Sequence, residues 1–375
     1  MTQAQTKQVR LRHRSRTMQV PIYLGKLLRS FIYQNDWKVL PMAAVIAAML
    51  AMVIRKDCFV TMEGTLKGAF GLTCVAIWNG CFNSIQSICR ERAIVKREHR
   101  SGMHITSYVF SHMVYQALLC LGQTGLMLYV FKLMGIHYPP LGLFSRYFAV
   151  DLFITLFLIT YASDMISLLV SSIAHTTTTA MTVMPFLLIF QLVFSGGIFS
   201  LPAWTAPFSS VTLSNYGIKC ISAQADYNSL PMVSAWTSLE NMSNDSITVT
   251  VTGEQLVKML QDEELPYVGQ LRQAQVMPEL TAGQLIDMLA ASPELQPALQ
   301  EPRDITFKLA DAFSFVGKEK IKDFVEAKTG QAMAKDAYYH SRGNVLAYWM
   351  IISAIGLAFA LASVIVLEFI DKDKR

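Results

Sequence analysis

Charged side chains are scarce in this sequence. Asp, Glu, Lys and Arg make up 16% of its 375 residues, against roughly 25% in an ordinary soluble protein, and apolar residues make up 53%. The shortage is uneven, because residues 223–342 hold 27 of the 59 charged residues while the rest of the chain contains long apolar runs. This distribution excludes an ordinary soluble protein and predicts a membrane protein with one water-exposed domain.

The charged segment also lacks the residues that build common sites. None of the six cysteines lies in it, so it has no disulfide framework and no Cys/His metal spacing. Its 17 acidic and 10 basic residues show neither calcium-loop order nor an Asp/His/Ser arrangement, and we interpret them as a solvated surface. The remainder has 22 basic and 10 acidic residues, which suits membrane topology and not a nucleic-acid partner.

Six apolar stretches approach the length of about 20 residues that a helix needs to cross the hydrocarbon core. They are residues 39–54, 67–89, 109–134, 147–173, 179–200 and 344–370. We therefore expect an all-α membrane protein with six transmembrane helices and an α-rich extracytoplasmic domain between helices 5 and 6. Its parts are a basic tail with an interfacial helix (1–38), five spans with a re-entrant segment (39–222), the outer domain (223–343), and the last span with a tail (344–375).

The distribution of Lys and Arg orients these spans. With both termini inside, the cytoplasmic segments hold 16 basic residues and the short outer loops hold five. The sequence thus predicts a multi-pass protein of the cell membrane with both termini cytoplasmic. We expect no cleavable signal peptide, because residues 1–38 contain no apolar core of the required length.

An amphipathic helix is expected just before the first span. Its apolar positions at helical spacing are Leu24, Leu27, Leu28, Phe31 and Ile32. Such a helix lies on the membrane face, and on periodicity alone a plain interfacial anchor is the simpler interpretation. The arginine-rich tail before it could contact anionic membrane lipid or a partner.

In the outer domain, residues 252–260 and 281–289 share five of nine residues. Each copy begins with a Thr followed three residues later by Gln, which is the capping-box arrangement of a helix start. The repeat predicts two similar short helices. Residues 247–251 alternate like a short strand, and residues 318–335 have the pattern of a third helix.

Polar residues within the spans are candidates for function. Asn79, Asn83 and Gln86 lie on one stripe of the second span, and because unpaired amides facing lipid are costly, the stripe should face other helices or a wet cavity. A helix-packing seam is the alternative. Asp164 is an intramembrane acid and a functional candidate by default, although a buried hydrogen-bonding role is the simpler interpretation.

Two connecting segments do not look like plain loops. Residues 90–102 carry charges of both signs, with Glu91 and Glu98 two helical turns apart, and this pattern suits docking onto another protein. A solvated inner loop is the alternative. After the fifth span, Gly196, Gly197 and Pro202 break a helix near the outer surface, which predicts a re-entrant or interfacial turn.

Four short motifs occur in order along the chain: Asn79-Gly-Cys-Phe82, Glu91-Arg with Glu98 and Gly102, Phe194-Ser-Gly196, and Asn215-Tyr-Gly217. Together with the six spans, the leading amphipathic helix and the outer insertion, they make the sequence resemble the transmembrane half of the G subfamily of ABC transporters, within the type-two export permeases. No single motif is specific, and the resemblance does not extend to the outer domain.

The resemblance implies roles for particular residues. Residues 24–32 would be the connecting helix. The segment with Glu91, Arg92, Arg97, Glu98 and Gly102 would be the coupling helix that takes force from an ATPase.

Within the spans, the resemblance implies a central substrate cavity between two halves. The matching positions are Val75, Asn79, Phe82, Ile189 and Leu192.

The outer gate departs from the family pattern. The matching residues are Ser195, Gly196, Gly197 and Ile198. Where the family often has a pair of leucines directly after the Ser-Gly, this chain has Gly197 and Ile198, so the substrate range does not transfer.

No Gly-x-x-x-x-Gly-Lys-Ser/Thr phosphate loop occurs in the sequence. We therefore expect a permease subunit that is not itself an enzyme and has no cofactor of its own. ATP and Mg would be bound by a partner ABC ATPase. A second six-helix half, identical or not, would complete an exporter of an amphipathic or hydrophobic substrate such as a drug, lipid or peptide.

Two alternatives come from other functional classes. One is a non-transporting membrane anchor or sensor that displays the outer domain as its binding part. The other is an ion- or proton-driven carrier, against which stand the few acidic residues in the spans and the absence of a detectable inverted repeat.

Overall fold

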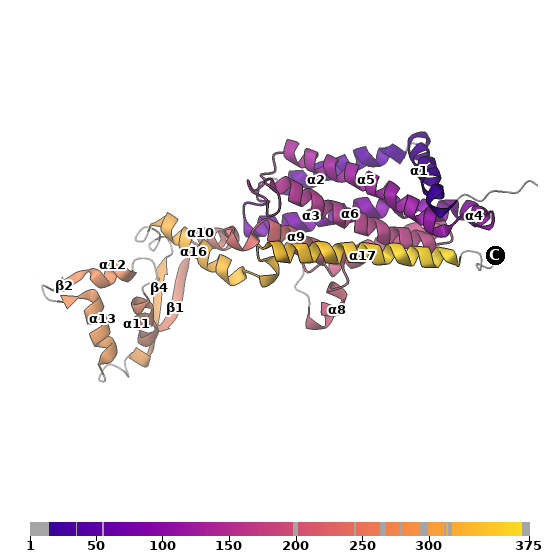
Figure 1. Ribbon diagram of the computed structural model, residues 1–375. Coiled ribbons are helices and arrows are strands. Elements are labelled where there is room, and N and C mark those ends of the chain that lie inside the picture. The colour runs from indigo at the N-terminus through magenta and orange to yellow at the C-terminus, as the bar shows by residue number, and fades with distance from the viewer. Residues whose placement is uncertain are drawn as a thin grey trace, which may run out of the picture. The chain divides into compact units, whose positions relative to one another are not determined.

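Figure 1 shows the computed structural model of the chain. It describes residues 15–34, 36–54, 56–197, 202–243, 245–262, 268–277, 280–292, 299–308, 310, 313 and 317–369. The chain divides into two compact units, one formed by residues 1–230 with 335–375 and the other by residues 231–334. The arginine-rich tail, Ile198 and residues 370–375 lie outside the described residues.

The first unit is a bundle of long helices that run side by side (Figure 1). Its main helices are α1 (Arg16–Tyr33), α2 (Val39–Ile54), α3 (Met62–Ser84), α4 (Ser87–Arg100), α5 (Ile105–Leu133), α6 (Phe148–Ile173), α7 (Thr177–Val193), α9 (Leu213–Gln224) and α17 (Arg342–Glu368). Short turns η1 (Asp36–Lys38) and η2 (Ala203–Thr205), together with α8 (Ala206–Ser209), join some of them. α1 matches the expected amphipathic helix but begins earlier, at Arg16.

Four helical segments of the described chain are long and apolar enough to cross a membrane. They are Asp36–Ile54, Ile105–Leu133, Phe148–Ile173 and Arg342–Glu368. α3 has the length but carries several polar residues along it, and α7 is apolar with only 17 residues. The chain is therefore a mostly helical membrane protein.

Small residues allow the central helices to approach closely. A Cβ at Gly80 of α3 would lie 2.1 Å from the carbonyl oxygen of Thr160 in α6. On the other side of α6, a Cβ at Gly356 of α17 would lie 3.1 Å from the Cα of Ala162. Backbone approach through small residues is typical of packing between membrane helices, where lipid supplies no hydrophobic drive for association. α6 is accordingly the centre of the bundle.

The second predicted span is wrong at its C-terminal end. The span was predicted to run to residue 89, but α3 ends at Ser84 and a new helix, α4, begins at Ser87. The Ser171 hydroxyl of α6 accepts the backbone N–H groups of Ile88 and Cys89 at 3.0 and 3.1 Å. Because the first amides of a helix have no partner within it, this hydroxyl stabilises the start of α4.

The fifth span also ends earlier than residue 200. α7 stops at Val193, and Gly196 adopts a φ of +68°, a left-handed conformation that glycine tolerates better than other residues. The chain then returns through η2 and α8 to α9.

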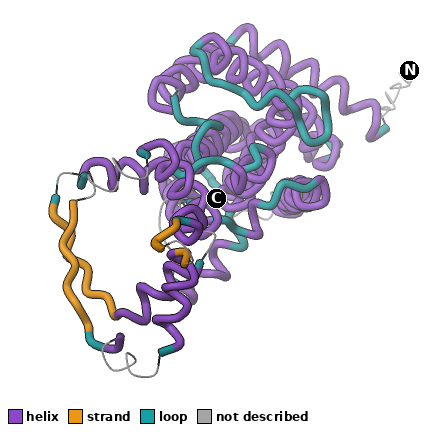
Figure 2. The backbone as a smooth tube through the Cα atoms, turned by 90° about the vertical axis from the view of Figure 1, so that its left-hand side faces the viewer, coloured by secondary structure: helices purple, strands orange, loops and turns teal. Residues whose placement is uncertain are grey.

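The second unit combines short helices with two small sheets (Figure 2). Strand β1 (Ser246–Thr252) pairs antiparallel with β4 (Pro302–Lys308), and β2 (Gln275–Met277) pairs with β3 (Leu280–Thr281). The helices are α10 (Val233–Asn241), α11 (Gly253–Gln261), α12 (Val268–Gln273), α13 (Ala282–Ala291) and α16 (Lys318–Met333). Both predicted capping boxes, at Thr252 and Thr281, are confirmed. The four strands show that the chain is not purely α-helical.

Candidate functional site

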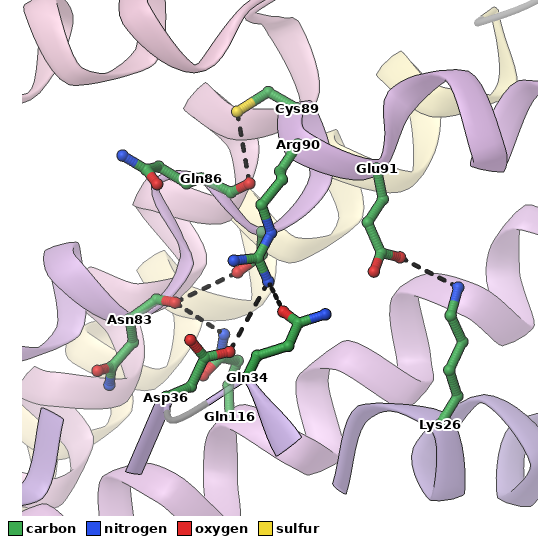
Figure 3. Close-up of polar contacts among 10 residues, drawn as sticks. Lys26, Gln34, Asp36, Asn83, Gln86, Cys89, Arg90, Glu91 and Gln116 are labelled. Atoms are coloured by element: carbon green, nitrogen blue, oxygen red, sulfur yellow. Dashed lines mark hydrogen bonds and ion pairs between the residues drawn. The ribbon is translucent and has the colours of Figure 1, made fainter. Parts of the chain in front are cut away.

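The short helix α4 is tied to its neighbours along one side (Figure 3). The Glu91 carboxylate accepts a hydrogen bond from the Lys26 ammonium of α1 at 3.2 Å. The Arg90 guanidinium donates to the side-chain oxygen of Gln34 at 2.9 Å and lies 3.7 Å from the carboxylate of Asp36. α4 is thus joined to α1 and to the segment that begins α2.

α4 is also joined to the end of α6. The Arg92 guanidinium donates to the backbone carbonyls of Ser172 and Ala174 at 2.7 and 3.4 Å. These carbonyls lie in the last turn of α6 and just after it, where no further helical amide is available to them. Arg92 therefore ties α4 to the end of the central helix.

The turn after α4 is closed by a side chain of α1. The amide of Gln19 donates to the carbonyl of Gly102 at 3.3 Å and accepts from the backbone N–H of His104 at 2.9 Å. Gly102 has a φ of +101°, which a residue with a Cβ adopts only with strain. Gly102 and Gln19 together fix the path between α4 and α5.

Glu98 faces α1 and not solvent. Burial, and then the charge of Glu98 and a hydrogen bond to it, raise the pKa of Tyr23 to about 12. One carboxylate oxygen of Glu98 is buried and makes no hydrogen bond among the described residues. Glu91 and Glu98, which the sequence suggested as docking residues, therefore lie on the side of α4 that contacts the bundle.

The exposed side of α4 shares Arg90 with the bonded side and otherwise presents different residues. Its exposed positions are Arg90, Ala93, Ile94, Arg97 and Arg100. They recur at helical spacing and give a basic stripe around one apolar side chain, Ile94, which is 39% exposed. Arg97 was a candidate from the sequence, whereas Ile94 and Arg100 were not, although their spacing from Arg97 places them on the same face.

A cavity of about 260 Å³ opens beside this helix. Its lining comes from α1, α3, α4, α5, α7 and the start of α2: Leu27, Ser30, Asp36, Val39, Phe82, Asn83, Ile85, Gln86, Ser87, Arg90, Glu91, His112, Tyr115, Leu119 and Met181. His112 is 2% exposed, and neither of its ring nitrogens has a hydrogen-bond partner among the described residues. We refer to this hollow as the polar cavity.

The three side-chain amides predicted on one stripe lie in different environments, and Gln86 lies beyond the end of α3. The side-chain amides of Asn83 and Gln123 exchange two hydrogen bonds, of 2.8 and 2.9 Å, and thus form a packing seam between α3 and α5. Gln86 lines the polar cavity instead, and Asn79 is buried with 6% exposure. Both interpretations of the stripe therefore apply, to different residues.

Asp164 is a buried hydrogen-bonding residue in the centre of the bundle. Its carboxylate accepts from the Cys120 thiol of α5 at 3.4 Å, and its backbone carbonyl accepts from the Ser84 hydroxyl of α3 at 2.6 Å. The Cys120 thiol is free, as are all six cysteines, and five of the six are buried. Asp164 thus joins three helices.

The candidate substrate residues differ in their burial. Val75 and Asn79 are buried, whereas Phe82 and Ile189 are 47% and 56% exposed. Leu192 is half-buried. Phe82 also lines the polar cavity.

The candidate outer-gate residues follow the end of α7. The Ser195 hydroxyl donates to the Leu192 carbonyl at 2.8 Å, and it accepts from the backbone N–H of Gly197 at 3.3 Å. A Cβ at Gly197 would lie 2.7 Å from the Cδ1 of Ile218 in α9. The remaining gate residue, Ile198, is outside the described part of the chain.

α9 is bonded to the end of α7. The side chain of Gln191 accepts the backbone N–H of Ser214, and the Ser214 hydroxyl donates to the Gln191 carbonyl. The Thr212 hydroxyl donates to the Phe194 carbonyl at 3.2 Å. The returning segment is thus held against the helix that it follows.

Comparison with known families adds one match. The model of the ABC-2 type transporter family matches residues 23–223, which is more than half of the chain. The matched segment contains α4 and every residue that lines the polar cavity. A search of curated proteins found no match.

Proposed function

Because this chain belongs to the family of ABC-2 type transporters, we propose that it is the permease subunit of an ATP-driven exporter. The substrate would be amphipathic or hydrophobic. The chain supplies the passage through the membrane, and a partner ABC ATPase, which binds ATP and Mg, supplies the force. No phosphate-loop motif occurs in the 375 residues, so this segment does not account for ATP hydrolysis.

The proposed topology has six spans, namely the four long apolar segments with α3 and α7. Both termini face the cytoplasm of a cell membrane, and the unit at residues 231–334 lies outside. The excess of Lys and Arg in residues 1–38, in α4 and after the last span supports this orientation.

The observation that carries the proposal is the two-sided character of α4. One side is bonded to α1 and to the last turn of α6 through Glu91 and Arg92, and the other side is exposed and basic. A helix with this arrangement can accept a push from a partner and pass it to the spans. We propose that the exposed stripe docks onto an acidic face of the ATPase.

Pairing with a second six-helix half would complete the substrate cavity. Phe82 of α3 and Ile189 of α7 are large apolar side chains that a single chain leaves exposed, so they are available to a second half. In the pair, these residues with Leu192 would line the cavity, and Val75 and Asn79 would lie behind them. Residues 195–198 would form the outer gate. An apolar lining supports an amphipathic or hydrophobic cargo.

The test uses variants on the exposed side of α4. We expect Arg97→Glu and Ile94→Asp to abolish copurification of the ATPase, or to lower the permease-dependent part of its activity about tenfold, which corresponds to about 1.4 kcal/mol. Arg146→Glu, at an exposed arginine before α6, is the matched control and should behave as wild type. Unchanged binding and activity in both α4 variants would contradict the proposal.

A further inference from the structure

A second hollow adjoins the polar cavity. It has a volume of about 170 Å³, and we refer to it as the apolar slot. Its lining is Leu28, Phe31, Leu40, Tyr115, Leu118, Leu119 and Gly122, from α1, α2 and α5. Tyr115 and Leu119 also line the polar cavity, so the two hollows share a wall.

The lining residues show how closely the two hollows adjoin. Leu27 of α1 and Val39 of α2 line the polar cavity, and the next residue in each helix, Leu28 and Leu40, lines the apolar slot. The two hollows therefore provide a polar and an apolar compartment at one place. This division matches a molecule with a polar headgroup and a hydrocarbon chain.

Helix α1, which contributes residues to both linings, gives lipid access to the two hollows. α1 is amphipathic and is not among the candidate spans, yet Ile22, Leu28 and Ile32 on it are 49%, 41% and 66% exposed. A helix of this kind lies in the membrane interface with its apolar residues among the acyl chains. A lipid of the same leaflet can therefore reach the slot from the bilayer.

Unpaired and charged groups define the headgroup. The two ring nitrogens of His112 are buried at the polar cavity without a partner among the described residues, although buried polar groups are normally hydrogen-bonded. The charged residues of the lining are Asp36, Glu91 and Arg90. A phosphodiester would bond Arg90 and His112, and an ammonium would lie by the carboxylates. Lys26 pairs with Glu91 and Arg90 lies beside Asp36, so the charges around the cavity balance, and a zwitterionic headgroup suits them better than one that carries only negative charge.

We propose that the polar cavity and the apolar slot form one binding site for a resident phospholipid whose headgroup carries an ammonium, such as phosphatidylethanolamine. The phosphate and ammonium occupy the polar cavity, and one acyl chain enters the slot. The lipid would fill the space between α1, α4 and α5. It would thereby hold the helices that surround α4 in place. This inference needs only the membrane location of the chain and does not depend on the exporter mechanism.

The first test compares lipids on the unaltered protein. The full chain, with any copurifying partner, is placed in nanodiscs of equal phosphatidylethanolamine and phosphatidylglycerol, released into mild detergent, and analysed by native mass spectrometry. We expect phosphatidylethanolamine to be retained about tenfold over phosphatidylglycerol. Equal retention of the two lipids, or retention of neither, would overturn the proposal.

A matched pair of variants locates the bound lipid. A Cβ at Gly122 would lie 3.8 Å from its nearest neighbour, Leu40, so Gly122→Leu fits the helix and fills the slot with its side chain. Gly125→Leu is the control, because its Cβ would also lie 3.8 Å from its nearest neighbour, Phe153, and Gly125 is not in the lining. Gly122→Leu should lose about nine-tenths of the retained lipid and Gly125→Leu almost none. Equal retention in both variants would overturn the location.

A second pair tests the headgroup. Asp36→Asn removes a carboxylate that lies 3.7 Å from Arg90, so it should shift retention toward phosphatidylglycerol. Asp57→Asn, at an exposed position between α2 and α3, should leave the preference unchanged. An unchanged preference in Asp36→Asn would contradict the assigned role of this carboxylate.

Discussion

Lys26 of α1 and Glu91 of α4 form an ion pair, with Nζ 3.2 Å from Oε2, that joins an amphipathic helix to the helix that follows α3. The Glu91 side chain is 15% exposed and that of Lys26 is 39% exposed. Because the pair is partly solvated, its contribution to stability is modest. Its importance lies in connecting two elements that are 65 residues apart in the chain.

The first prediction concerns this ion pair. Lys26→Glu and Glu91→Lys should each loosen α4 and lower the permease-dependent ATPase activity, because each variant places like charges together. The double exchange should recover most of the activity, with a coupling energy of about 0.5–1 kcal/mol from a double-mutant cycle. Additive losses in the double variant would show that the pair does not join α1 to α4.

A second prediction concerns the turn after α4. Gly102→Ala places a Cβ on a residue with φ +101° and should destabilise the turn by about 1–2 kcal/mol. Gly135→Ala, with φ +80° after α5, carries similar backbone strain away from α4 and is the matched control. Both variants should melt at lower temperature than wild type. Only Gly102→Ala should also lose ATPase stimulation, and equal stimulation in the two variants would argue against a role of this turn in coupling.

The helix contact at Gly80 gives a third prediction. Gly80→Ala forces a Cβ to within 2.1 Å of the Thr160 carbonyl oxygen, so α3 and α6 must separate, at a cost of about 1–3 kcal/mol or more. Gly125→Ala should be nearly neutral, because its Cβ has 3.8 Å of clearance. Thermal unfolding in detergent, monitored by size-exclusion chromatography, measures the difference in midpoint between the two variants. Similar midpoints for the two variants would contradict the packing of α3 on α6.

The capping boxes of the second unit give a fourth prediction. Thr252→Ala and Thr281→Ala each remove the hydroxyl that accepts the backbone N–H of Gln255 or Gln284, at a cost of about 1 kcal/mol to α11 or α13. Hydrogen exchange on the full chain should show faster exchange in the first turn of the altered helix only. Thr237→Ala, within α10, removes a hydroxyl that bonds to the Val233 carbonyl and serves as the control. Unchanged exchange at the altered cap would contradict the capping role.

Local signals in the sequence predicted much of this architecture. The Thr-x-x-Gln spacing predicted the starts of α11 and α13, since a capping box involves residues three apart. The alternation of residues 247–251 predicted β1 but not its partner. β4 pairs Pro302 with Thr252 and Lys308 with Ser246, and no periodicity within a strand identifies a partner so far along the chain.

The sequence predicted several residues of the candidate site but not which neighbours their side chains contact. The charges of residues 90–102 favoured docking onto another protein, which stays a prediction, and the structure shows that most of this segment lies in helix α4. They did not show that Glu91 faces Lys26 or that Arg92 reaches the end of α6, because such contacts depend on how distant helices pack. A packing seam at Asn83 was one of the two interpretations, but its partner, Gln123, was hidden for the same reason.

The central claim is that ATP hydrolysis by a partner drives substrate through this chain. The most direct measurement is the uptake of fluorescent amphiphilic dyes into inside-out vesicles that contain the chain and its copurified ATPase. The account predicts uptake that requires Mg-ATP, stops with a non-hydrolysable analogue, and is lost in Arg97→Glu but kept in Arg146→Glu. Dye uptake that is the same with and without ATP would contradict it.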